Sequence, residues 1–379
     1  MGLALFAAMP VFAQQKATIN VHPEQGKEII SKHIYGQFAE HLGTCIYGGL
    51  WVGEDSKIPN TQGYRNDVLQ ALKAIPKLHK YDLIVSHGMQ SAVVVCLYRR
   101  FFRGKEKHIV FDIGSFNSAA ESGSALKLMQ FASRSIDGLI YHTSAQHAYY
   151  EKFFPWLVEK SQFVRFGTDG VFWKKETDSK EEIKDAAAVE NSSVPYILCV
   201  GYIKRDWDTL YRAYAALAKQ YELQRPGFML PVLRMVGKAE YQPPEGERLS
   251  ECAKLELIPY IPVRELMTQI QNAQFCVLPL ESFLYSYGQM TLLQQMALGK
   301  AVIVAKVPSM LDYVQDGENA CFYEAKNASD LCGKMEDFLK NPERRETIGS
   351  NAADYVKRVH NEKDMALQIE AFYDSVLKE

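Results

Sequence analysis

Three short glycine-containing segments hold the residues of this sequence that are best suited to bind an anion. Each segment follows a run of apolar residues of the kind that forms a buried strand. They supply Gly201, Lys204 and Arg205 in "VGYIKRDW", Gly237 and Lys238 in "VGKAEY", and Tyr287, Gly288 and Gln289 in "SYGQM". Lysine and arginine side chains, together with the N–H groups at the start of a helix, favour a phosphate group. These segments predict a diphosphate site, and solvated turns with ordinary surface charges are the alternative.

The segment "SYGQMTLLQQMALGKAVIV", Ser286–Val304, indicates which elements must position these residues. A glycine-bearing turn opens an amphipathic helix, which leads into a β-branched strand, and this is one unit of an open α/β sheet. In such a sheet ligands bind beyond the carboxyl ends of the strands, against helix N-termini. A turn that holds a ligand is one interpretation of Gly288, and a core helix whose turn simply requires glycine is the other. Asp206 is expected to cap the helix that follows Arg205.

Two series of such units predict two domains. Residues 76–185 offer strands at Tyr81–Ser86, His108–Ile113, Gly138–Ser144 and Gln162–Phe166. Residues 195–379 offer strands at Tyr196–Tyr202, Leu230–Val236, Ile258–Ile261, Phe275–Leu280 and Ala301–Ala305, and helices at Trp207–Tyr221, near Glu245–Leu255 and at Val263–Ala273. The polar run at 174–193 reads as a solvated helix or linker between them. We expect an α/β protein with two Rossmann-like, doubly wound domains that face a cleft.

From about residue 80 to the end, the chain resembles the retaining glycosyltransferases of family 4. The resemblance rests on "YILCVG…RDWDTLYRAYAAL", "IPVRELMTQIQNAQFCVLPL", "QMALGKAVIVA" and "MLDYVQDGENACFY". It implies the GT-B fold and the transfer of a sugar from a nucleoside-diphosphate sugar with retention of configuration. The E-x7-E signature of that family falls on Ser286, which would face the donor sugar, and Gln294, which would bond to the ribose. Both glutamates are therefore missing, although glutamine can still donate and accept hydrogen bonds.

The same resemblance implies roles for the cations and for Asp112. Arg205, with Lys204 or Lys238, would offset the charge on the leaving diphosphate and so stabilise the transition state. Gly201 and the amides of Tyr287, Gly288 and Gln289 would contact the nucleotide-sugar. Asp112 would bind sugar hydroxyls or position the acceptor, and a structural hydrogen bond is the alternative for this residue.

The partners follow from this assignment. A nucleoside-diphosphate sugar is the expected donor, no further cofactor is expected, and the arrangement requires no metal. The acceptor is an unidentified sugar, lipid or small molecule. A catalytically impaired nucleotide-sugar binder is the second hypothesis, because the two glutamates and the first strands of a GT-B amino-terminal domain are missing.

Residues 16–75 resemble a different family. The stretch "IYGQFAEHLGTCIYGGLWVGEDSKIPNTQGYRNDVLQALK" is similar to the start of the family 51 glycoside hydrolases, the α-L-arabinofuranosidases, and includes a helix expected at Asn66–Ala74. In that family the glutamate at the position of Glu40 touches the arabinose. A retaining glycosidase needs two carboxylates about 5 Å apart, and in that family both lie on barrel strands that this sequence does not contain. Arabinofuranosidase activity is therefore the least favoured hypothesis, and a fusion of two gene fragments near Ile75–His79 is the simplest account.

Composition adds limits on partners and compartment. The 379 residues carry 43 basic and 45 acidic side chains, and this balance gives no reason to expect a nucleic-acid partner. Seven scattered cysteines without a C-x-x-C pair indicate buried reduced thiols. These features favour a cytoplasmic protein or one peripheral to a membrane, whereas the apolar tail at 1–15, "MGLALFAAMPVFAQQ", resembles the remnant of a secretory signal.

Overall fold

The computed structural model of the chain describes residues 55–56, 60–62, 64–87, 89–102, 104–112, 121–174, 194–237, 240–282 and 285–378. The chain divides into two compact units, residues 1–36 and residues 37–379, and every described residue belongs to the second unit. The tail at 1–15, Glu40, most of the hydrolase-like fragment and nearly all of the polar run lie outside the described residues. The end of the fragment is described, and its predicted helix is confirmed as α1 (Asn66–Ala74), after the short strands β1 (Asn60–Thr61) and β2 (Tyr64–Arg65).

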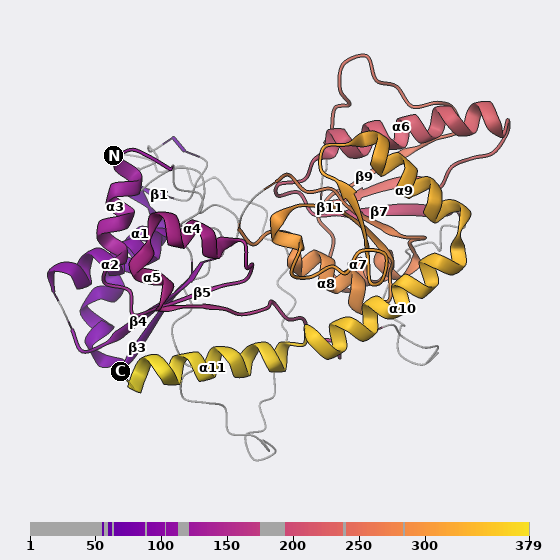
Figure 1. Cartoon of the computed structure of the whole chain (residues 1–379). Coiled ribbons are helices and arrows are strands. Elements are labelled where there is room, and N and C mark those ends of the chain that lie inside the picture. Colours follow the sequence, from indigo (N-terminus) through magenta and orange to yellow (C-terminus); the bar gives the residue numbers. More distant parts are fainter. Residues whose placement is uncertain are drawn as a thin grey trace, which may run out of the picture. The chain divides into compact units, whose positions relative to one another are not determined.

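The first domain contains a four-stranded parallel sheet whose strands follow one another in chain order (Figure 1). Its strands are β3 (Leu83–His87), β4 (Lys107–Asp112), β5 (Gly138–Tyr141) and β6 (Ser161–Phe163). Its helices are η3 (Ile75–Lys80), α2 (Met89–Phe101), α3 (Ser124–Ser133), α4 (Gln146–Phe153) and α5 (Pro155–Val158). Apolar side chains of α2 to α5 form one buried cluster with β4 and β5. All four predicted strands are confirmed, with ends that differ by a few residues.

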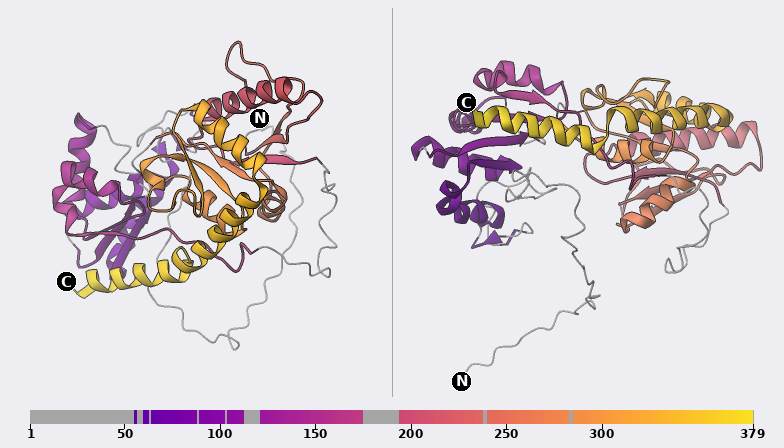
Figure 2. Two further views of the ribbon diagram at one scale, coloured as in Figure 1. Left: turned by 45° about the vertical axis from the view of Figure 1, so that its right-hand side comes forward. Right: turned by 90° about the horizontal axis from the view of Figure 1, so that it is seen from below.

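A helix from the far end of the chain covers other strand residues of this sheet. Helix α11 (Glu362–Lys378) runs alongside β3 and β4 in Figures 1 and 2, and its Phe372 and Val376 belong to a cluster with Ile109. Gly138 provides the space, since a Cβ atom there would lie 2.9 Å from the Phe372 ring. The last residues of the chain therefore complete the core of the first domain.

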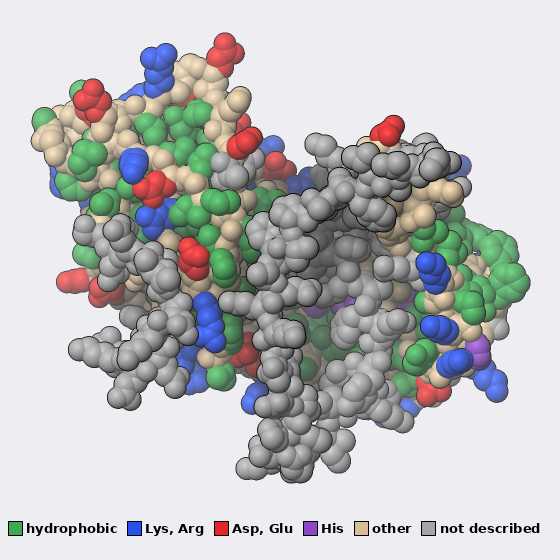
Figure 3. Space-filling view, turned by 180° about the vertical axis from the view of Figure 1, so that it is seen from behind, with side chains coloured by type: hydrophobic (Ala, Val, Ile, Leu, Met, Phe, Trp, Pro, Cys, Tyr) green, Lys and Arg blue, Asp and Glu red, His purple; other side chains and the backbone are tan. Residues whose placement is uncertain are grey.

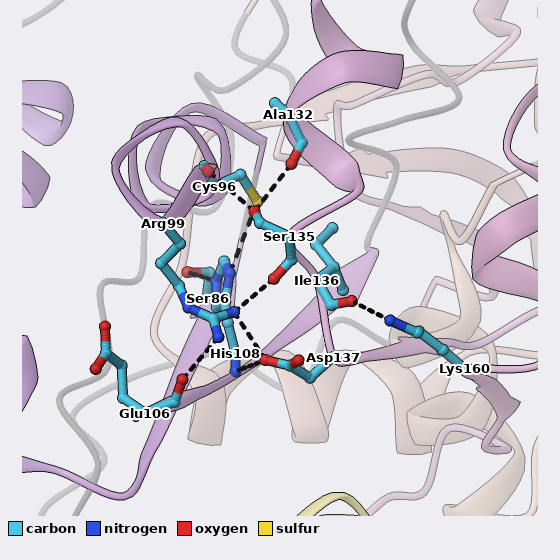
Figure 4. Close-up of polar contacts among 10 residues, drawn as sticks. All are labelled: Ser86, Cys96, Arg99, Glu106, His108, Ala132, Ser135, Ile136, Asp137 and Lys160. Carbon is cyan, nitrogen blue, oxygen red and sulfur yellow. Dashed lines mark hydrogen bonds and ion pairs between the residues drawn. The ribbon is translucent and has the colours of Figure 1, made fainter. Parts of the chain in front are cut away.

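Buried polar groups tie α2 to this sheet (Figure 4). Arg99 lies 2.7 Å from the carboxylate of Asp137 and donates to the backbone oxygens of Ser135 and Glu106. The same Asp137 carboxylate accepts from the backbone N–H of His108 at 2.8 Å, and the His108 ring Nε2 shares a hydrogen bond of 2.9 Å with the Ser86 hydroxyl. Since all these bonds join residues inside the domain, this network is structural.

The second domain contains a six-stranded parallel sheet in the order β12-β11-β10-β7-β8-β9. The strands are β7 (Tyr196–Val200), β8 (Val232–Val236), β9 (Leu255–Ile258), β10 (Cys276–Leu278), β11 (Val302–Lys306) and β12 (Cys321–Glu324). The helices are α6 (Trp207–Gln224), α7 (Val263–Asn272), α8 (Gln289–Ala297), η4 (Pro308–Met310), α9 (Ala328–Lys340) and α10 (Pro342–Val359). Every residue of β7, β8 and β10 is buried, as expected for a parallel sheet covered on both faces.

Two expectations for this domain are wrong, and both involve proline or glycine. The helix predicted near Glu245–Leu255 is absent, because two prolines precede Gly246, which adopts φ +80° in a turn. The strand predicted at Ile258–Ile261 is found at Leu255–Ile258, and it ends just before Pro259, which has no N–H for the ladder. The cap by Asp206 is confirmed, since its carboxylate accepts from the Thr209 N–H at 3.1 Å.

The cysteine prediction holds for the part of the chain that the structure describes. Its six cysteines are all buried and free. Within the same described residues, no helix has the length and apolar character needed to cross a membrane.

Two helical glycines give a matched test of packing in the second domain. A Cβ atom on Gly349 of α10 would lie 2.2 Å from the Gly299 backbone oxygen, whereas one on Gly333 of α9 would meet nothing within 4 Å. We expect Gly349→Ala to lower the free energy of unfolding by about 2 kcal/mol, because backbone cannot yield cheaply. Gly333→Ala should raise it by about 0.5–1 kcal/mol through helix propensity. Urea denaturation of both variants checks the opposite signs, and two changes of the same sign would contradict the packing argument.

Candidate anion site at the switch point of the second sheet

The strand order of the second sheet reverses between β7 and β10. Chain order runs outward from β7 through β8 to β9 on one side, and from β10 through β11 to β12 on the other. In open parallel sheets, ligands bind beyond the strand ends at such a reversal. The turns after β7 and β10 are two of the three glycine segments singled out in the sequence. The third follows β8, so all three open on the same edge, as predicted.

The turns after β7 and β10 contact each other directly. Arg205 and Leu280 form an isolated antiparallel bridge, and the Asp206 N–H donates to the Pro279 oxygen at 3.0 Å. The Glu281 N–H donates to the Lys204 oxygen at 3.2 Å. These backbone bonds fix the entry to α6 beside the end of β10.

Arg205 has a buried guanidinium with neutral partners. Its Nε donates to the Val200 oxygen at 3.1 Å and its Nη1 to the Ile203 oxygen at 2.9 Å. Its Nη2 lies 3.3 Å from the Thr291 hydroxyl, in the first turn of α8. Burial lowers the pKa of Arg205, and no carboxylate of the described residues pairs with it. A cation without a counter-charge is thereby held at the start of a helix, where an anion is favoured.

Glycine is required at two positions of this edge. Gly201 adopts φ +95°, and a Cβ atom there would lie 2.6 Å from the Arg205 guanidinium. Gly288, the N-cap of α8, adopts φ +88°, and a Cβ atom there would lie 3.1 Å from Leu280. The conformational requirement expected at Gly288 is confirmed, and its contact with a ligand stays a prediction.

The second cation is placed differently from Arg205. The Lys204 ammonium lies 3.9 Å from the Glu281 carboxylate, so part of its charge is already compensated. Gly237, at the end of β8, packs against Gly201, with 3.5 Å between the backbone of Gly201 and a Cβ atom built on Gly237. Lys238 lies outside the described residues.

The remaining candidates lie on α8 and the segment before it. Ser286 and Tyr287 are partly exposed ahead of the helix, and the first amides of an α-helix have no acceptor within the helix. The side chain of Gln289 is buried and donates to the backbone oxygen of Ser309 at 3.0 Å. The backbone amide of Gln289 is therefore the group that is left as a candidate contact for a ligand. Gln294 is partly buried, three residues after Thr291 and hence on the same face of α8.

Asp112 lies at the end of β4 and is fully buried. Its carboxylate accepts from the Gln146 side chain at 2.8 Å and from the Tyr150 hydroxyl. These contacts support the structural alternative for this residue. A catalytic role for Asp112 stays a prediction.

Sequence reasoning missed Thr291 and Glu281. Thr291 contacts Arg205 and Glu281 contacts Lys204, and in each case the two residues lie in segments that are far apart in the chain. A carboxylate directly after the strand "CVLPL" was the available signal for Glu281. Thr291 gave none beyond its place in the first turn of a helix.

The fold and this edge define the class: the chain has the GT-B fold, as expected from its sequence. Residues 180–355 match the model of the family "Glycosyl transferases group 1". Among solved structures, Anabaena HepE in complex with UDP superposes with a TM-score of 0.62 at 16% identity, over 80% of this chain and 82% of that one. Sucrose-phosphate synthase from Thermosynechococcus elongatus gives a TM-score of 0.61 at 18% identity, over 86% and 88%. The likeness to group 1 glycosyltransferases is thus confirmed for most of the second domain.

The likeness to arabinofuranosidases is also found. An intracellular exo-α-L-arabinofuranosidase of Bacteroides ovatus is 70% identical over 69 residues, which make up 18% of this chain. The chain spans only 13% of the length of that enzyme.

Proposed function

We propose that this protein is a retaining glycosyltransferase of the family 4 type, whose donor is a nucleoside-diphosphate sugar. The observation that carries the proposal is Arg205, a buried guanidinium without a carboxylate partner among the described residues. It lies at the switch point of the sheet, between the turn after β7 and the first turn of α8. A bound diphosphate would supply the negative charge that pairs with Arg205. When the sugar leaves, more negative charge develops on the diphosphate, and Arg205 would stabilise it.

Further support comes from the surroundings of Arg205 and from the structural neighbours. Gln294 follows Thr291 on one face of α8, where its amide can bond to two ribose hydroxyls. Ser286 offers one hydroxyl to the donor sugar, in place of the carboxylate of the family signature. Anabaena HepE, which shares the fold, has been crystallised with UDP and with UDP-glucose.

Ser286 and Gln294 also favour a second candidate function. A chain that keeps the phosphate site and lacks both signature carboxylates could bind a nucleotide-sugar without transferring the sugar. The two functions differ in turnover and share the same donor site. Binding and transfer must therefore be measured separately.

Calorimetric titration with UDP, GDP and ADP tests the donor site and identifies the base. Gln294→Ala is expected to weaken binding of the preferred nucleotide about tenfold, through loss of hydrogen bonds to the ribose. Gln315→Ala, at an exposed glutamine outside the three segments, is the control and should leave binding unchanged. No binding of any nucleotide by the folded chain would contradict both candidates, whereas binding without release of sugar to any acceptor would favour the second.

A further inference from the structure

The end of α2 and one side of α3 expose aromatic rings in the first domain. Phe101 is 69% exposed and Phe102 is 65% exposed, although buried phenylalanine is the usual case. Phe131 and Leu128 of α3 are 40% and 45% exposed. Hydrophobic side chains gather at the right-hand edge of the space-filling view, with Lys and Arg side chains beside them (Figure 3).

These side chains form one surface, named here the aromatic patch: Tyr98, Phe101, Phe102, Leu128 and Phe131. The ring centroids of Phe101 and Phe131 are 6.0 Å apart, and those of Tyr98 and Phe102 are 5.5 Å apart. The Arg100 guanidinium lies over the Phe131 ring, 4.8 Å from its centroid. The patch is therefore preorganised by contacts between α2 and α3.

Among the described residues, the exposed charged side chains on α3 and between Phe102 and β4 are all basic, and the exposed Glu121 ahead of α3 is paired with Lys152. The sequences of α2 and α3 contain no Asp or Glu. The segment between Phe102 and β4 contains one acid, Glu106, which is buried, and an exposed Lys105. Lys127 and Arg134 are exposed on and just after α3. Arg99 is excluded from this count because Asp137 neutralises it.

We propose that the aromatic patch docks the protein on the surface of an anionic lipid bilayer. Exposed phenylalanine rings gain free energy when they enter the boundary between headgroups and acyl chains. Lysine and arginine beside them attract anionic headgroups, with a contribution that adds from one cation to the next. The exposed aromatic rings suit the apolar boundary of the bilayer. The lysine and arginine side chains beside them suit its anionic headgroups, and no described carboxylate is exposed on α2 or α3.

Vesicle sedimentation tests this proposal with the full chain. Vesicles of phosphatidylcholine with phosphatidylglycerol should pellet the protein, and vesicles of phosphatidylcholine alone should pellet much less. Lys105→Glu with Lys127→Glu should weaken binding at least about fivefold for each lysine. Phe101→Ser with Phe102→Ser should weaken it about tenfold for each ring that inserts.

The matched controls lie outside α2 and α3. Leu223 and Met229 are 84% and 61% exposed, so Leu223→Ser with Met229→Ser alters equally exposed apolar side chains outside the patch. Lys219→Glu with Lys363→Glu repeats the charge change on exposed lysines elsewhere. Equal loss in a control pair, or equal pelleting with neutral and anionic vesicles, would overturn the proposal. A different result would also overturn the proposal: light scattering shows a dimer, Phe101→Ser with Phe102→Ser dissociates that dimer, and the chain binds no vesicles.

Discussion

Arg205→Met is expected to weaken binding of a nucleoside diphosphate about a hundredfold while the protein stays folded. The arginine donates only to neutral oxygens in the described structure, so its charge contributes little to the unliganded fold. Methionine fills a similar volume, and loss of a buried charge offsets part of the cost of the carbonyls left without a donor. The free energy of unfolding should therefore change by no more than about 2 kcal/mol.

Calorimetry with the preferred nucleotide and urea denaturation, made on the same samples, separate the two possible roles of Arg205. If the arginine only braces the turn after β7 against α8, stability will fall steeply and the remaining folded protein will bind normally. That outcome would remove the main support for the donor site.

Two glycine variants provide an independent route to the same question. Gly201→Ala should displace the guanidinium, since its Cβ atom would lie 2.6 Å from Arg205. Gly227→Ala is the matched control, because Gly227 also has positive φ, +83°, and a Cβ atom there meets nothing within 4 Å. Both variants carry backbone strain of about 1–2 kcal/mol, but Gly201→Ala alone should lose nucleotide affinity.

Acid is expected to unfold this protein at a higher pH than its carboxylates would require. Burial lowers the pKa of His108 to about 3 and the pKa values of His87, His142 and His360 to about 4. In the unfolded chain each would titrate near the ordinary value of 6.5. Above that value neither the folded nor the unfolded chain binds these protons, so the histidines do not lower the free energy of unfolding. As the pH falls from 6.5 toward 4, the unfolded chain binds protons that the folded chain does not, so stability falls.

The expected slope is about 1.4 kcal/mol per pH unit for each histidine, or about 5.5 kcal/mol per unit for the four together. A typical domain is stable by roughly 5–15 kcal/mol, so unfolding should set in near about pH 5. Urea denaturation at a series of pH values measures the slope. His108→Gln should reduce it by about a quarter. A stability that stays constant between about pH 7 and pH 5 would contradict this account.

Local patterns were enough to predict most of the fold. Runs such as "YILCV" and "AVIVA", rich in β-branched residues, favour buried strands between helices, and Asp206 predicted the start of α6. The helix expected near Glu245–Leu255 was wrong because Gly246, after two prolines, adopts φ +80° in a turn. The strand β12 was not predicted as an element, since "CFYE" is short and follows a loop.

The sequence was enough to predict which turns form the candidate site. It was not enough to predict which side chains contact one another there. Glycine after a buried strand indicates where a turn must open, and this placed Gly201, Gly237 and Gly288 on one edge. The partners of the cations depend on which strands become neighbours. Arg205 and Thr291 are separated by 86 positions, and no local pattern encodes their meeting. The burial of Asp112 against Tyr150 likewise depends on how α4 packs on the sheet.

The packing of α11 on the first sheet has a consequence for how the protein is made. Strand β6 ends at Phe163, but Phe372 and Val376, which help to complete that core, are translated 209 and 213 positions later. At roughly 5–20 residues per second, a ribosome needs on the order of 10–40 s to pass from one to the other. During that interval the nascent first domain has one face without its helix, while the second domain can already fold. The domain made first should therefore mature only after α11 has been synthesised, and it should rely on a holding chaperone until then.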